Sequence, residues 1–180
     1  CLEGLARMGI KKLIRFGTTG TIQEKVNLGD IIVDKAAVRL DGTSQHYAPL
    51  EFPAVASFEV TTALVLAAKN AGALYHLGIA ASSDTFWPGQ ERYDSFTGYV
   101  PRGTMQEWQA LGVLNYEMET SALFVTSQAL GLEAGAVCGV VVKRTQSESV
   151  APPDVYQRAF GYMVQVTRGA VELLLAADAD

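Results

Sequence analysis

A nearly continuous apolar run at residues 132–142 constrains the fold of this chain more than any other feature. Val, Ala and Gly dominate the run, and Glu133 is its only charged residue. Such a composition is typical of a β-strand whose two faces are both covered, as in a sheet that lies between layers of helices. The run is also too short to cross a bilayer as a helix. It therefore predicts a central strand of an α/β protein.

Other expected strands and helices alternate along the chain. We expect strands at residues 11–17, 74–81 and 113–116 and one or two strands formed by residues 31–33 and 36–40. We expect helices at residues 1–9, 54–69, 105–111 and 119–130. A last helix opens at Pro152 and Pro153, and its apolar stripe is Ala159, Met163, Val166, Ala170 and Leu173. The alternation predicts a three-layer α/β/α fold with a central mixed β-sheet flanked by helices, in a single domain of residues 1–180.

The composition limits the classes of partner and chemistry. The net charge is −5 without a Lys/Arg cluster, which argues against nucleic acid and anionic membranes as partners. Cys1 and Cys138 provide neither a disulfide framework nor a metal-ligand spacing, and no catalytic Ser-His-Asp or paired-His pattern stands out. We therefore expect a cytoplasmic protein without a metal site. Only 18% of the residues are charged, which favours burial of part of the surface in an oligomer.

Polar motifs follow four of the expected strands, and α/β folds bind their ligands beyond the carboxyl ends of strands. A Gly-Thr-Thr-Gly motif, expected to form a turn, occupies residues 17–20. Residues 82–94 follow the strand at 74–81, and a Glu-Met-Glu motif follows the strand at 113–116. Arg144 is the second residue after the apolar run, and it is either anchored at the surface by snorkelling or held in a pocket.

The segment from Phe86 to Asp94 carries the most specific chemistry. Gln90 offers an acceptor and two donors in one plane, and Arg92 offers a fork of permanently charged donors. Together they can match the edge of a ring that bears an N–H between two carbonyls, as uracil does, while Phe86 covers the ring face. The alternative is a surface loop in which Arg92 pairs with Glu91 or Asp94.

The motifs after the other strands each have two interpretations. Arg15, beside the Gly-Thr-Thr-Gly motif, can hold a phosphate to which Thr18 adds a hydrogen bond, or it can be a surface arginine beside an ordinary turn. The carboxylates of Glu117 and Glu119 can accept hydrogen bonds from the cis-diol of a ribose while Met118 packs on the sugar ring. Alternatively, the two acids satisfy free N–H groups at a helix N-terminus.

Five phrases, taken together and in order, resemble the bacterial uridine phosphorylase branch of the nucleoside phosphorylase-I superfamily. They are RFGTTGTIQ at 15–23, VRLDGTSQHYAPLEFPA at 38–54, SSDTFWPGQERYD at 82–94, NYEMET at 115–120 and VVKRTQ at 141–146. The resemblance implies reversible phosphorolysis of uridine to uracil and ribose 1-phosphate, through an oxocarbenium-like transition state and without a covalent intermediate. Inorganic phosphate is then a co-substrate, and no cofactor is needed.

The resemblance also implies roles for individual residues. It implies that phosphate is bound by Arg15 and Thr18. It implies that ribose is bound by Thr18, Glu117, Met118 and Glu119. The uracil site comprises Thr19, Gly20, Phe86, Gln90, Arg92, Val141, Val142 and Arg144. The residues expected to contribute to catalysis are Arg15, Gln90, Arg92, Glu119 and Arg144.

Members of this family also carry an N-terminal part that supplies a glycine-rich phosphate loop. We therefore expect further structure upstream of this chain, and we expect the chain by itself to be inactive. The resemblance implies a mobile flap at residues 147–156 and a homo-oligomer, with a hexamer as the assembly. The alternatives are a phosphorylase or hydrolase for another nucleoside, a non-catalytic nucleoside-binding protein, and a structural fragment without a ligand.

Overall fold

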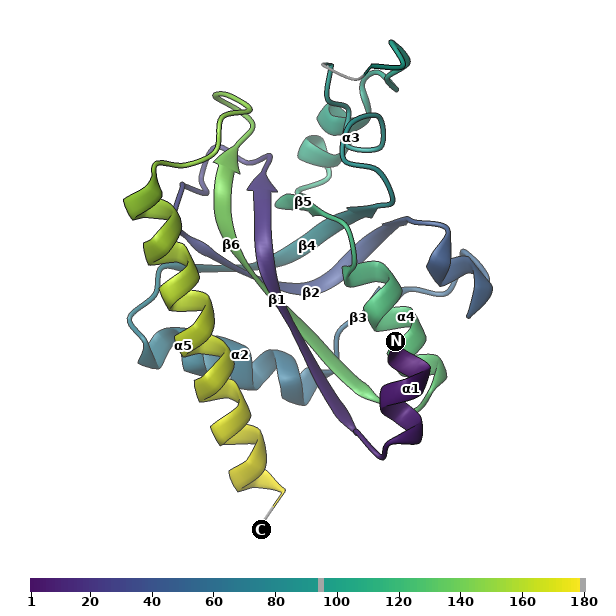
Figure 1. Ribbon diagram of the computed structural model, residues 1–180, viewed down its shortest axis with the longest axis vertical. Helices are drawn as coiled ribbons and strands as arrows, with labels where there is room; N and C mark the ends of the chain where they lie inside the picture. Colours follow the sequence, from purple (N-terminus) through teal and green to yellow (C-terminus); the bar gives the residue numbers. More distant parts are fainter. Residues whose placement is uncertain (94–95, 179–180) are drawn as a thin grey trace.

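The computed structural model describes residues 1–93 and 96–178, and in it a mixed β-sheet lies among helices (Figure 1). The helices are α1 (Leu2–Arg7), the 3₁₀ helix η1 (Thr43–His46), α2 (Phe58–Asn70), α3 (Thr104–Ala110), α4 (Thr120–Ala129) and α5 (Pro153–Ala177). The strands are β1 (Lys12–Thr21), β2 (Ile31–Leu40), β3 (Ala54–Val55), β4 (Tyr75–Ser83), β5 (Asn115–Glu117) and β6 (Glu133–Lys143).

The sheet contains both parallel and antiparallel pairs, and it closes on itself. Its strand order is β3-β2-β4-β5-β1-β6, with a further pairing between β2 and β6. The pairs β1–β6, β2–β4 and β4–β5 are parallel, whereas β1–β5 and β2–β6 are antiparallel. The predicted mixed sheet is thus confirmed, and β6 is a central strand that lies between β1 and β2, as the apolar run predicted.

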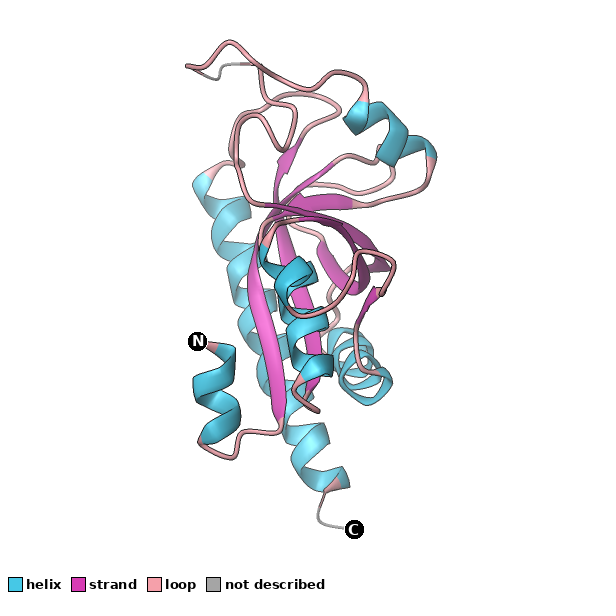
Figure 2. Cartoon of the chain, turned by 90° about the vertical axis from the view of Figure 1, so that its right-hand side faces the viewer, coloured by secondary structure: helices cyan, strands magenta, loops and turns pink. Residues whose placement is uncertain are grey.

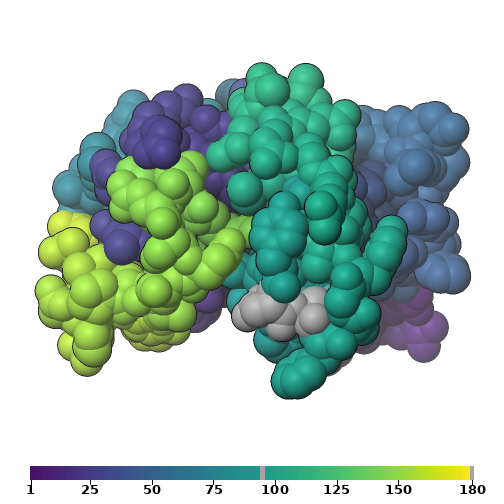
Figure 3. All heavy atoms as spheres, turned by 90° about the horizontal axis from the view of Figure 1, so that it is seen from above, coloured from purple at the N-terminus to yellow at the C-terminus, as the bar shows by residue number. Residues whose placement is uncertain are grey.

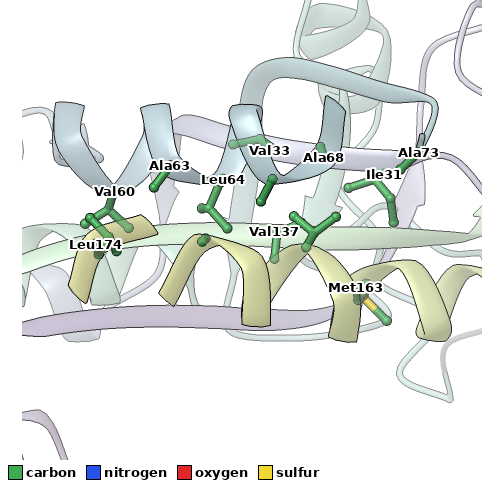
Figure 4. Close-up of a cluster of buried hydrophobic side chains, with 13 residues drawn as sticks. Ile31, Val33, Val60, Ala63, Leu64, Ala68, Ala73, Val137, Met163 and Leu174 are labelled. Carbon is green, nitrogen blue, oxygen red and sulfur yellow. The ribbon is translucent and has the colours of Figure 1, made fainter. Parts of the chain in front are cut away.

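Helices cover the sheet on two sides (Figure 2). On one side α2 and α5 pack against each other and against the sheet. Figure 4 shows Val60 of α2 beside Leu174 of α5 and Leu64 near Val137, with Met163 farther along the same core. On the other side α4 places Phe124 in a second core with residues of β4 and β6. Each large side chain buried in this way contributes about 1.5–3 kcal/mol to stability. This layering confirms the predicted fold class.

The structure corrects local expectations in β1 and α5. Residues 17–20 do not form a turn, because β1 continues to Thr21 with its partners on β6 and with Gly20 opposite Tyr116 of β5. Ladder hydrogen bonds on both sides override the turn preference of glycine here. On α5 the buried stripe ends at Leu174 and not at Leu173. Steps of three and four residues from Ala170 both stay near the buried face of the helix, and Leu174 is the one that packs in the core with α2.

Candidate functional site

Four segments that are distant in sequence surround one cavity of about 220 Å³ at the end of β1, β5 and β6. Figure 3 looks onto this end of the molecule, where the segment after β6 lies beside the segment between β4 and β5. The lining residues are Arg15, Thr18, Thr19, Gly20, Phe86, Gln90, Arg92, Tyr116, Glu117, Met118, Glu119, Val141 and Val142. All the site residues that the sequence predicted line this cavity except Arg144. Tyr116 also lines it, although the sequence did not indicate a role for this residue.

Arg15 lies among acidic side chains. Its Nε donates to Oε2 of Glu119 at 3.0 Å, its Nη2 donates to the same oxygen, and Oε2 of Glu117 is 3.6 Å from Nη2. Its Nη1 donates to Sγ of Cys138 at 3.0 Å. Arg15 is thus not a surface arginine beside a turn, because its side chain is only 17% exposed and its guanidinium is bonded to Glu119 and Cys138.

The two acids of the Glu-Met-Glu motif have different environments. Glu117 is 3% exposed, and its Oε2 accepts hydrogen bonds from the N–H groups of Glu119 and Thr120, both at 2.8 Å. It therefore satisfies free N–H groups at the start of α4, which was one of the two interpretations of this motif. Its Oε1 accepts from Ser82. Glu119 is exposed, and its carboxylate is bonded to Arg15.

Gln90 and Arg92 are both buried at the wall of the cavity, at 3% and 5% exposure. Nη2 of Arg92 donates to Oε1 of Gln90 at 3.4 Å, and its guanidinium carbon is 4.1 Å from the centre of the Phe86 ring. The alternative of a surface loop with an Arg92–Glu91 pair is wrong, because Arg92 pairs with Glu148. Asp94, the other suggested partner, lies outside the described residues.

Arg144 is buried behind the cavity and does not snorkel to the surface. It is 7% exposed, and its guanidinium lies 5.3 Å from the centre of the Tyr116 ring. Its Nε donates to Oε1 of Glu148 at 2.7 Å, and burial lowers its pKa below the ordinary value for arginine. Glu148 thus bridges Arg92 and Arg144. The spacing of four residues between Arg144 and Glu148 was the sequence signal for this pair, although no helix holds them.

Beneath Arg15 lies a buried polar group that the sequence did not indicate. Cys138, expected to be a core residue, is fully buried, and its thiol donates to Oδ2 of Asp34 at 3.3 Å. Burial, together with the charge of Glu117, raises the pKa of Asp34 to about 8. Asp34 is therefore largely protonated at neutral pH.

The remaining expectations concern the two threonines of the Gly-Thr-Thr-Gly motif, a metal site and a membrane span. Thr19 is buried, and its hydroxyl donates to the carbonyl of Tyr116 at 2.6 Å, whereas Thr18 is exposed at the mouth of the cavity. Within residues 1–93 and 96–178, no group of three or more His, Cys, Asp or Glu side chains is arranged to hold a metal ion. The described helices include none that is long and apolar enough to span a membrane.

Comparison with known proteins relates most of the chain to one family. A model of the phosphorylase superfamily matches residues 2–160. The uridine phosphorylase of Escherichia coli is 52% identical over 177 residues, which cover 97% of the chain and 70% of the relative. That of Haemophilus influenzae is 56% identical over 82% of the chain and 60% of the relative. The guanosine phosphorylase of Halorubrum lacusprofundi is 32% identical over 77% of the chain and 53% of the relative.

Proposed function

The chain belongs to the phosphorylase superfamily, and we propose that it catalyses the reversible phosphorolysis of uridine to uracil and ribose 1-phosphate. The observation that carries this proposal is the single cavity that Gln90 and Arg92 share with Arg15, Glu117 and Glu119. An amide, two guanidinium groups and carboxylates suit a pyrimidine edge, a phosphate and a sugar diol. The 52% and 56% identity to two uridine phosphorylases supports the choice of uridine as the nucleoside.

In this proposal Gln90 and Arg92 bind the edge of the uracil ring. Cleavage of the N-glycosidic bond leaves negative charge on the base and positive charge on the ribose. Donors that are aimed at the base carbonyls stabilise this charge more in the transition state than in the ground state, which accelerates the reaction. Phe86 packs against the ring, and Arg144 supports a base carbonyl. The walls of the uracil site are formed by Thr19, Gly20, Val141 and Val142.

Arg15 and Thr18 hold inorganic phosphate, which is the nucleophile. One phosphate oxygen forms a bond to C1′ of the ribose while the bond to the base nitrogen breaks, and uracil leaves with the bonding electrons and takes up a proton. The transition state resembles an oxocarbenium ion, so the neighbouring phosphate anion stabilises it. Glu119 accepts hydrogen bonds from the ribose hydroxyls, beside Met118 and Glu117. No cofactor takes part, and Arg15 exchanges its contact with Glu119 for phosphate.

The loss of uridine, followed by ultraviolet absorbance with and without phosphate, tests this proposal. The assay is run on the chain alone and on the chain joined to the part of the Escherichia coli relative that its alignment leaves uncovered. We expect cleavage that depends on phosphate in the joined protein. Cleavage without phosphate would indicate a hydrolase, and cleavage of guanosine in place of uridine would indicate a purine enzyme. Uracil binding without any cleavage would indicate a nucleoside-binding protein.

We also propose that the protein is a cytoplasmic homo-oligomer, with a hexamer as the assembly, and that it binds neither nucleic acid nor membranes. Phe160, Val164 and Val171 are exposed along α5 at 48%, 44% and 42%, and the chain has few charged residues to cover its surface. Exposed apolar side chains of this kind favour association between protein surfaces. Light scattering coupled to gel filtration tests the assembly, and the mass of a single chain at every concentration would contradict it.

A further inference from the structure

Glu91 occupies a backbone position that glycine ordinarily fills. The N–H of Arg92 donates to the carbonyl of Trp87 at 2.8 Å, and the N–H of Glu91 donates to the carbonyl of Pro88 at 3.1 Å. This pair of bonds is the Schellman arrangement, whose second-to-last residue adopts a left-handed conformation. Glu91 has a φ of 55°, and it is the only residue other than glycine with a positive φ in the described parts of the chain.

Two properties of this position are unfavourable for a glutamate. The left-handed conformation brings Cβ close to the following carbonyl oxygen, so residues other than Gly, Asn and Asp seldom adopt it. Glu91 is also only 2% exposed, and a buried carboxylate needs hydrogen bonds to offset its lost hydration. Backbone strain of this kind persists where the surrounding contacts over-determine the conformation.

The contacts that hold Glu91 come mainly from the start of α3. Its Oε2 accepts hydrogen bonds from the N–H of Met105 at 2.6 Å and from the hydroxyl of Thr104 at 2.9 Å. Its Oε1 accepts from the N–H of Gly103 at 2.6 Å and from the hydroxyl of Tyr93 at 3.1 Å. Burial raises the pKa of Glu91, but the hydrogen bonds outweigh burial and lower this pKa below its ordinary value. The side chain is therefore an anion that ties the turn at residues 87–92 to α3.

The residues on either side of Glu91 both line the cavity. The Gln90 and Arg92 side chains face it, whereas the Glu91 carboxylate is bonded to α3. The direction of Gln90 and Arg92 thus depends on how the turn between them is held. A glycine at residue 91 would satisfy the backbone of this turn, but it would not hold the turn against α3.

We infer that Glu91 is a positioning residue for recognition of the base, because its carboxylate fixes on α3 the turn that directs Gln90 and Arg92 into the cavity. This inference rests on the proposed function, since it concerns how the proposed uracil site is built. It distinguishes the side chain of Glu91, which does the anchoring, from its backbone, which glycine could replace.

The substitution Glu91→Gly separates these two contributions. It relieves the left-handed strain and keeps the turn, and it removes the anchor. Small displacements of a binding group reduce activity steeply, so we expect the KM for uridine and the Kd for uracil to rise roughly tenfold or more, with the KM for phosphate nearly unchanged. We expect Glu91→Gln, which keeps only part of the acceptor set, to give a smaller change in the same direction.

The matched control is Glu107→Gln, which makes the same chemical change at an exposed position of α3 and should leave all three constants unchanged. Uracil binding is measured by calorimetry, and the melting temperature shows whether each variant is folded. If Glu91→Gly does not fold, the inference is tested instead with Glu91→Gln and Thr104→Ala, by the same KM values for uridine and phosphate and the same Kd for uracil. Unchanged uridine and uracil constants in a folded variant, or an equal loss for phosphate, would overturn the inference. All kinetic constants are measured in the joined protein. Failure of the unsubstituted joined protein to cleave uridine would instead overturn the proposed function, and uracil binding would still test Glu91.

Discussion

Arg92 is the residue whose removal tests the proposed base site most directly, because it is buried at the cavity wall beside Gln90 and Phe86. Removal of one donor that faces developing charge costs about 10²–10³ in kcat in other enzymes. We expect Arg92→Ala to lower uridine turnover by about 100-fold or more and to leave the affinity for phosphate nearly unchanged. Steady-state kinetics with each substrate varied in turn measures both effects. Arg102→Ala, at an exposed position in the same segment, is the control, and unchanged turnover in Arg92→Ala would contradict the base-site assignment.

The raised pKa of Asp34 leads to a prediction about how the stability of the folded protein depends on pH. Its pKa is raised from 3.8 to about 8 by burial and by the charge of Glu117. Between these values the folded protein holds a proton that the unfolded chain releases, so the contribution of Asp34 to stability falls as the pH rises through this window. Asparagine cannot ionise at this position. We therefore expect the melting temperature of Asp34→Asn, measured relative to that of the unsubstituted protein, to increase as the pH rises from about 5 to about 9. A constant difference between the two melting temperatures across this pH range would show that Asp34 does not titrate in it.

The sequence predicted single residues where a motif carried its own chemistry. Gln90 and Arg92 stand two residues apart after an aromatic, so their placement in one site could be predicted without a structure. The pairs Glu148–Arg92 and Asp34–Cys138 were not predicted, because in each of them the two partners are remote along the chain. A local pattern cannot report such pairs, since the fold alone brings the partners together.

At the scale of elements, the close approach of α2 to β6 depends on Gly135. A Cβ atom at this residue would lie 2.5 Å from Cγ1 of Val60 and 3.0 Å from Cδ1 of Leu64. Gly135→Ala therefore forces α2 away from β6, and overpacking of this kind costs about 1–3 kcal/mol. We expect a melting temperature lower by several degrees in a thermal unfolding experiment.

The same substitution at Gly161 provides the control for Gly135→Ala. A Cβ atom at Gly161 has no neighbour within 4 Å, and the residue lies within α5. Because alanine favours the helical conformation by about 1 kcal/mol over glycine, Gly161→Ala should raise the melting temperature. If Gly135→Ala were as stable as Gly161→Ala, the packing of α2 on β6 would be looser than the structure indicates.

The strands and helices themselves were predictable where a periodic or continuous apolar pattern marked them. The run at 132–142 became β6 with a shift of one residue at each end, and the helix expected at 119–130 became α4. The helix expected at 54–69 starts later, because Ala54 and Val55 pair with β2 as β3. Two residues are too few to carry a strand pattern, so only the neighbouring strand determines their conformation.

At the scale of the whole molecule, the closure of the sheet was beyond prediction. The alternation of strands and helices predicted a mixed sheet, but it carries no information about which strands meet at the edges. The antiparallel pairing of β2 with β6 joins the last strand of the order to the strand next to β3, with Ile32 opposite Cys138 and Asp34 opposite Ala136. This pairing also places Asp34 and Cys138 together beneath Arg15, so the closure of the sheet builds the floor of the candidate site.

The closure of the sheet predicts which backbone amides exchange their hydrogens most slowly with solvent. The middle of β6 is bonded to β1 on one side and to β2 on the other, and residues 134–143 are buried throughout. Its amide hydrogens can exchange with solvent only when the sheet opens, whereas α1 buries no residue and can fray alone. In hydrogen–deuterium exchange we therefore expect residues 136–139 to exchange several orders of magnitude more slowly than residues 3–7. Comparable rates in the two segments would mean that β2 and β6 separate without global unfolding, and the site floor at Asp34 and Cys138 would then be a local and transient arrangement.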